Sequence, residues 1–397
     1  MSAAADSLRQ DVRVIGLVAL AHGLSHFYQI ATAVLFPLIR DDLGVSYAAL
    51  GGTVALYYIV SGICQTLAGF AVDRYGARRV LFAGLALAVG GALMAGLAQN
   101  FPMLVAAAVV GGLGNSVFHP VDFSILNARV DKARLGYAFS WHGIAGYLGY
   151  AAAPAYGIAM ASAFGWRGAL LGAAAIGVAV VALLASQGTV LQAAPVRQRH
   201  AVSGMQALLQ APVLMCFGYF VMIGVGFIAI QTFGIATMVS LYGVNVAFAS
   251  AALTAFLLGG ATGIFFGGFL AVRATRHDLV AVSGMACSAA LMFVLASAWL
   301  PAVALPLLLG AAGFAGGLTN PSRDLIVRAS TPAGATGRVY GFVYSGLDVG
   351  SMVTPVIFGW LIDRGQPAAV FYTVVAVLAV SILTVLQLPG RRLNAGS

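Results

Sequence analysis

Long apolar runs separated by short polar turns make up most of this sequence. A helix needs roughly 20 apolar residues to cross a hydrocarbon layer about 30 Å thick, and in lipid the backbone groups must bond within their own segment. Each run therefore predicts one membrane-spanning helix. Twelve such spans are predicted, at residues 14–38, 48–70, 80–98, 102–126, 135–161, 168–187, 212–239, 247–270, 279–299, 303–326, 338–361 and 369–388.

The least hydrophobic interval lies in the middle of the chain and divides six spans from six. We predict an N-terminal six-helix bundle over residues 1–187, a cytoplasmic linker over 188–210 and a C-terminal six-helix bundle over 211–397. A thin repeat relates the halves. An offset of 201 residues superposes Pro120 on Pro321, Gly136 on Gly337, Gly149 on Gly350 and Pro154 on Pro355. The predicted fold class is therefore an all-α membrane protein of two pseudo-symmetric six-helix bundles.

The composition agrees with a membrane protein, because 61% of the residues are hydrophobic and only 8% are charged. The net charge of +9 would suggest a nucleic-acid partner if it were spread evenly, but the basic residues concentrate in alternate loops. With the N-terminus inside, the opposite side keeps only Arg40, Arg167 and Arg364. This positive-inside pattern predicts a protein of the inner (plasma) membrane with both termini in the cytoplasm. No nucleic-acid partner is expected.

Ionisable side chains inside the spans are the candidate functional residues, because each costs roughly 2.5–3.5 kcal/mol at membrane depth on insertion scales. No glutamate occurs in the chain, so a carboxylate that carries a proton must be an aspartate. The candidates for binding substrate or coupling protons are His22, His26, His119, Asp122, His142, Tyr344 and Asp348.

The histidines admit three interpretations. His22 and His26 are four residues apart and share one helix face. At about 1.5 Å of rise per residue, His22, His119 and His142 all come to a depth of roughly 12–15 Å. They either fix helix packing, for which His142 is the strongest candidate, or couple protons, since imidazole titrates near neutral pH. The third interpretation is a transition-metal site, with His22, His26 and His119 as candidate ligands.

Asp348 is the sharpest single candidate in the second half, because it lies in the middle of an apolar span at a similar depth. Two roles remain open for it. It is either a protonatable or cation-binding carboxylate, or a structural aspartate paired with Arg323 or Arg328 of the neighbouring span. The adjacent Arg323 and Asp324 lie nearer the cytoplasmic end, where a local salt bridge is expected.

The loop between the second and third spans has the sequence GFAVDRYGARR, from Gly69 to Arg79. It resembles the signature loop of the major facilitator superfamily, with Gly69, Asp73, Arg74, Gly76, Arg78 and Arg79 at the matching positions. Gly69 is expected to allow close helix packing and Gly76 a tight turn. The resemblance implies twelve spans around a central cavity, and a loop that braces the cytoplasmic gate. The corresponding second-half stretch has Val272 in place of the aspartate, so gating is expected to be asymmetric.

Two shorter patterns point to a branch of that superfamily. The stretch FHPVD, with His22, resembles the fosmidomycin-resistance type of efflux transporter, although His26 stands where that pattern has an aspartate. Gly149, Pro154 and Gly157 match part of an antiporter motif. The arginine of proton antiporters would fall on Ala108 and is absent. The patterns favour export over import.

The resemblance implies a proton-coupled secondary transporter that moves a small organic solute by alternating access. The expected partners are that small-molecule substrate, protons and the lipid bilayer, and the protein is expected to be a monomer with no cofactor. Transport of a metal ion or chelate through a histidine-lined cavity is one alternative, and a non-transporting membrane sensor or assembly factor is another. No nucleophile–base pair or metal-hydrolase spacing is present, so an enzyme is not expected.

Overall fold

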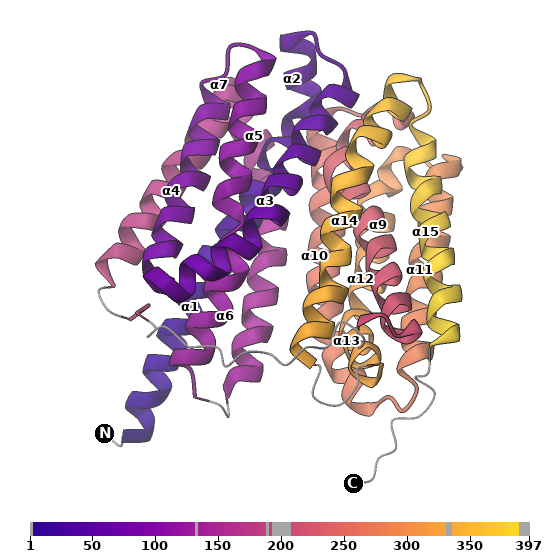
Figure 1. The fold of residues 1–397 in the computed structure, drawn as a ribbon. Helices are drawn as coiled ribbons and strands as arrows, with labels where there is room; N and C mark the ends of the chain where they lie inside the picture. The colour runs from indigo at the N-terminus through magenta and orange to yellow at the C-terminus, as the bar shows by residue number, and fades with distance from the viewer. Residues whose placement is uncertain (1–2, 132–133, 188–189, 193–207, 331–335, 389–397) are drawn as a thin grey trace. The chain divides into compact units, whose positions relative to one another are not determined.

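The computed structural model describes residues 3–131, 134–187, 190–192, 208–330 and 336–388, and the described chain is almost entirely helical (Figure 1). The chain forms two compact units. The first contains residues 1–45 and 56–200, and the second contains residues 46–55 and 201–397. Most of the predicted linker at 188–210 lies outside the described residues.

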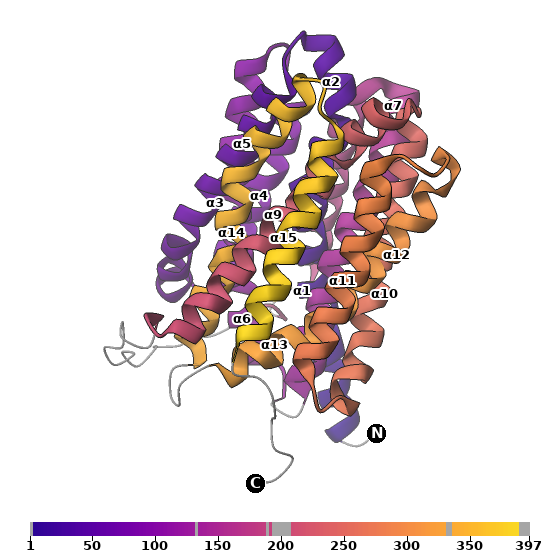
Figure 2. The ribbon, with the colours of Figure 1, turned by 90° about the vertical axis from the view of Figure 1, so that its right-hand side faces the viewer.

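The first unit is a bundle in which α1 packs along α7, and α4 packs against both α5 and α7. Its helices run side by side in both views (Figures 1 and 2). Its elements are α1 (Ala3–Ala31), the 3₁₀ turn η1 (Ala33–Leu35), α2 (Phe36–Leu43), α3 (Tyr47–Tyr75, whose first nine residues belong to the second unit), α4 (Ala77–Gly96), α5 (Phe101–Asn115), α6 (Phe118–Arg129) and α7 (Leu135–Ser186).

The second unit repeats this scheme, with α9 packed along α14, α10 against α12, and α11 against α15. Its elements are α9 (Ala211–Tyr242), α10 (Val246–Arg273), α11 (His277–Ser297), the 3₁₀ turn η3 (Ala302–Ala304), α12 (Leu305–Leu318), α13 (Asn320–Ala329), α14 (Thr336–Asp363) and α15 (Ala368–Gln387).

Eleven helical segments in the described part of the chain are long and apolar enough to cross a membrane. One of them, Trp141–Ser186, lies within α7, which is 52 residues long and leaves the helical conformation at Gly165, with φ 70° and ψ 170°. Two helices therefore meet at that glycine, and each is close to the length of one span. With this break counted, the spans agree with the twelve that the hydrophobic pattern predicts.

Prolines interrupt one span in each unit at corresponding places. Pro120 has no N–H and cannot bond the carbonyl of Ser116, so the fourth span breaks between α5 and α6. Pro321 does the same in the second unit, where α12 gives way to α13 at Thr319. The break in the first unit puts His119 in the first turn of α6.

Glycines allow a close helix crossing in the first unit. A Cβ at Gly149 of α7 would collide with the backbone of Gly23 in α1, so only glycine permits this approach. Gly350 of α14 has the same relation to the backbone of α9 near Val221 and Gly224. Because His22 directly precedes Gly23, this crossing also determines which side chains of α7 lie against His22.

Candidate functional site

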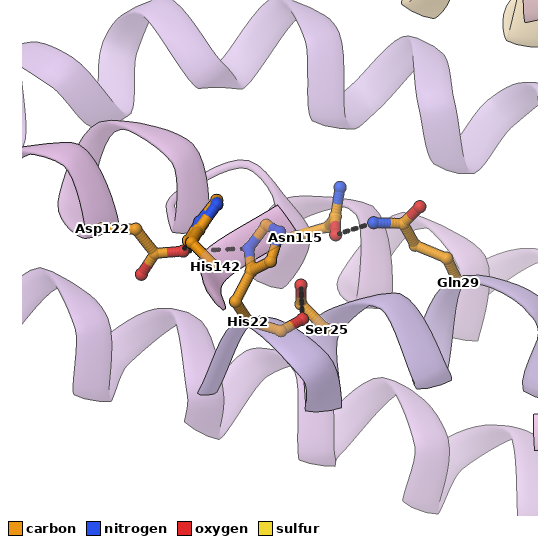
Figure 3. A network of polar contacts seen from close by, with 6 residues as sticks. All are labelled: His22, Ser25, Gln29, Asn115, Asp122 and His142. Atoms are coloured by element: carbon orange, nitrogen blue, oxygen red, sulfur yellow. Dashed lines mark hydrogen bonds and ion pairs between the residues drawn. The ribbon is translucent and has the colours of Figure 1, made fainter. Parts of the chain in front are cut away.

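A buried carboxylate between two histidines is the centre of the candidate site (Figure 3). Oδ2 of Asp122, on α6, lies 3.0 Å from Nδ1 of His22 on α1 and 3.1 Å from Nε2 of His142 on α7. Asp122 has no solvent exposure, and His22 and His142 are 2% and 6% exposed. Three helices thus bring one acid and two bases together away from bulk solvent.

The hydrogen bonds among Asp122, His22 and His142 determine the net charge of this cluster. If each neutral imidazole donates one N–H to Asp122, the second nitrogen of each ring keeps its lone pair. Oδ1 of Asp122 has no hydrogen-bond partner among the described residues, and no arginine or lysine in that part of the chain pairs with this carboxylate. The cluster therefore carries one net negative charge when both rings are neutral, and becomes neutral when it takes up one proton.

Two further histidines surround this centre. The ring centroids of His22 and His142 are 3.5 Å apart and stacked, and the ring of His119 lies 5.4 Å from that of His22. His119 is exposed, unlike the other two. His22, His119 and His142 each offer one ligand atom within 4.8 Å of the others. The ring centroid of His26 lies 4.3 Å from that of His22. The sequence analysis named His26 as the third candidate metal ligand, but in the structure the third ring of this trio is that of His142.

An uncharged polar network adjoins the histidines, and sequence reasoning missed it. Gln29 donates from Nε2 to Oδ1 of Asn115 at 3.0 Å, and its Oε1 accepts hydrogen bonds from the hydroxyls of Tyr58 and Tyr150. The ring of Tyr150 also lies 4.4 Å from that of His26, which joins the two groups. One signal was available: Gln29 follows His22 by seven residues, so both project from the same face of α1.

The predicted residues of the second half lie on α14 and α13 of the second unit. The hydroxyl of Tyr344 donates to Asp324 at 2.8 Å, and Nε of Arg323 lies 3.2 Å from the same oxygen, so the expected local ion pair is present. No hydrogen bond or ion pair reaches Asp348 from any described residue. Pairing with Arg323 is therefore not found, and the side chain of Arg328 lies outside the described part.

Comparison with known proteins decides the family. The sequence profile of the Major Facilitator Superfamily matches residues 18–242 and, a second time, residues 215–395. The chain belongs to the Major Facilitator Superfamily. The family and fold are those of transporters rather than of enzymes. The chain is accordingly a multi-pass membrane protein.

Individual members of the superfamily resemble this chain over part of its length. The multidrug resistance protein B homolog of Mycobacterium tuberculosis is 31% identical over 175 residues, which are 44% of this chain and 32% of that protein. The fosmidomycin resistance protein of Escherichia coli K12 is 25% identical over 153 residues, covering 38% of this chain and 37% of that protein. The alignments thus span about a third of the length of these relatives.

The superfamily fold extends over the whole chain. A bacterial homolog of the human lysosomal transporter Spinster, solved in an inward-facing and occupied conformation, superposes with a TM-score of 0.80. The superposition covers 97% of this chain and 99% of that one at 13% sequence identity, so it shows the fold alone. The predicted fold class is confirmed.

The superfamily's signature loop lies where α3 ends and α4 begins. Gly76 forms the turn between them with φ 84°, a conformation that favours glycine. Arg74 and Arg78 lie over the rings of Tyr75 and Phe82, Arg79 is exposed, and the side chain of Asp73 is outside the described part. A Cβ at Gly69 would meet no atom within 4 Å in the described structure, so the expectation of close packing there was wrong.

Proposed function

We propose that this chain is a proton-coupled secondary transporter that exports a small organic solute by alternating access. The observation that carries the proposal is the fully buried Asp122, held by His22 and His142 through a single oxygen. We assign the proton to this cluster. In the second half we assign the matching protonatable role to Asp348, with Tyr344 beside it on α14.

The energetics of burial support a coupling role. A net charge in a low-dielectric interior costs several kcal/mol unless it is compensated, and the three side chains differ by one charge between their two protonation states. Imidazole exchanges protons near neutral pH, which makes the change accessible in the cell. A proton can drive a carrier between two conformations only if it binds them with different affinity. The change in buried charge provides a source of that difference.

The neighbouring side chains support the proposal of a small organic solute. An uncharged hydrogen-bonding network lies next to His26 and consists of Gln29, Asn115, Tyr58 and Tyr150. Such groups suit a solute with hydroxyl, amide or acid oxygens. Export is supported by the two relatives named for drug resistance. We further propose a monomer in the plasma membrane with both termini cytoplasmic, built as bundles 1–187 and 211–397 around the linker 188–210.

The test begins with a thermal-stabilisation screen of the purified protein. It should include fosmidomycin, other drugs and organic acids at two pH values, because a ligand that binds the folded state raises apparent stability. The strongest hit is then followed in proteoliposomes under an imposed pH gradient. We expect Asp122→Asn to reduce gradient-driven transport at least tenfold, while exchange of solute at equal pH continues.

The matched control is Asp41→Asn, because this carboxylate is exposed and should leave transport unchanged. His26→Ala and Asp348→Asn extend the test to the histidine pair of α1 and to the second unit. If gradient-driven transport is unchanged in all three of the Asp122, His26 and Asp348 variants, the assignment of proton coupling is wrong.

A further inference from the structure

We propose that His22, His119 and His142 bind a divalent transition-metal ion, of which Zn²⁺ is the representative. The trio comes from three helices, α1, α6 and α7, and each ring offers one nitrogen within 4.8 Å of the other two. This inference goes beyond proton coupling, since it concerns a second ligand and depends only on the geometry of the first unit.

The spacing of the nitrogens suits a metal ion with little rearrangement. Zn–N bonds of about 2.0–2.1 Å in a tetrahedral site place the ligand nitrogens about 3.4 Å apart. Ligand atoms that are up to 4.8 Å apart therefore need to approach by up to about 1.4 Å, which side-chain rotations can provide. Imidazole is a preferred ligand of zinc, copper and nickel, and three histidines with one open position form a recurrent zinc arrangement.

Asp122 supplies the outer support that metal-binding histidines need. A histidine ligand commonly donates its other ring N–H to a carboxylate, which fixes the tautomer and the orientation of the ring. Oδ2 of Asp122 lies 3.0 Å from Nδ1 of His22 and 3.1 Å from Nε2 of His142, so it would hold two of the three rings if the metal takes the other nitrogen of each. Its negative charge, which no arginine or lysine of the described residues neutralises by an ion pair, also favours a dication.

The three proposed ligands differ in exposure. His22 and His142 are buried, whereas His119 is exposed at the start of α6. An ion that enters the site would therefore meet His119 before the two buried rings. Within the described part of the chain no other three histidine, cysteine or acidic side chains meet in this way. His277 of the second unit is a matched control, because it is buried against Ser322 and remote in sequence from the trio.

The experiment measures metal binding by the purified protein. The protein is produced with an affinity tag that contains no histidine, so that the tag does not bind the metal. Co²⁺ is the probe, since its visible absorption reports ligand number, and Zn²⁺ is the competitor. We expect one Co²⁺ per chain, displaced by Zn²⁺. His119→Ala should weaken binding at least tenfold, and Asp122→Asn should weaken it about 10–100-fold, the usual effect of losing an outer-shell partner. His277→Ala should bind as the wild type does.

Two results would overturn the proposal: no stoichiometric Co²⁺ binding by the wild type, or equal binding by His119→Ala. Because His119 is exposed, its truncation should leave the unfolding temperature unchanged, and that temperature is measured for every variant. Proton-coupled transport is assayed separately with a chelator present. Failure of the metal site therefore leaves the proposed transport intact, and failure of proton coupling leaves metal binding intact.

Discussion

Replacing Gly149 by alanine is expected to push α1 away from α7 and to destabilise the first unit. The added Cβ would lie 2.8 Å from the carbonyl carbon of Gly23 and 3.1 Å from its Cα, and closer still to the carbonyl oxygen. The obstructing atoms are backbone, so no side-chain rotation relieves the clash. The helices must separate until the contact reaches an ordinary van der Waals distance.

The size of the effect follows from that displacement. Forcing one extra methyl group into a well-packed crossing typically costs about 1–3 kcal/mol. For a unit of this size, each kcal/mol lowers the unfolding temperature by about 2–4 °C, so a decrease of about 2–12 °C is expected. The displacement also moves His22, the neighbour of Gly23, away from His142. Affinity for Co²⁺ should therefore fall together with stability.

Thermal unfolding of the detergent-purified protein, followed by intrinsic fluorescence, measures this prediction. The control is Gly143→Ala on the same helix, because a Cβ at Gly143 would have no neighbour within 4 Å among the described residues. That variant should unfold at or slightly above the wild-type temperature, since alanine favours helix over glycine. If Gly149→Ala unfolds at the wild-type temperature, the α1–α7 crossing has room for a side chain and the reasoning fails.

Two further substitutions test the polar contacts of the first unit. Gln29→Leu removes the acceptor of two tyrosine hydroxyls and the donor to an asparagine. We expect the free energy of unfolding to fall by about 1–3 kcal/mol and solute binding to weaken. Wild-type values of both quantities would contradict the network. Arg134→Ala removes the 2.6 Å bond to the buried carboxylate of Asp11 and should cost about 1–3 kcal/mol by the same measurement, whereas the exposed Arg9→Ala should cost nothing.

The candidate site could be predicted only in part. His22, His26, His119 and Asp122 were recognisable because ionisable groups are costly inside a span and stand out from an apolar background. His142 was also found, with packing as its favoured role, but the sequence did not show that it lies 3.1 Å from Asp122. Gln29 and its partners were missed because uncharged polar residues cost less at membrane depth.

The sequence by itself determined the number of spans and the family, because hydropathy, breaks at proline and a contiguous loop motif are local properties. Only the tertiary structure decided which side chains meet. In a membrane helix the lipid-facing and the buried positions are both apolar, so hydropathy hardly encodes the rotation of the helix about its own axis. Close crossings such as that of Gly23 and Gly149 set this rotation, and they bring His22 to a carboxylate 100 residues away in the chain.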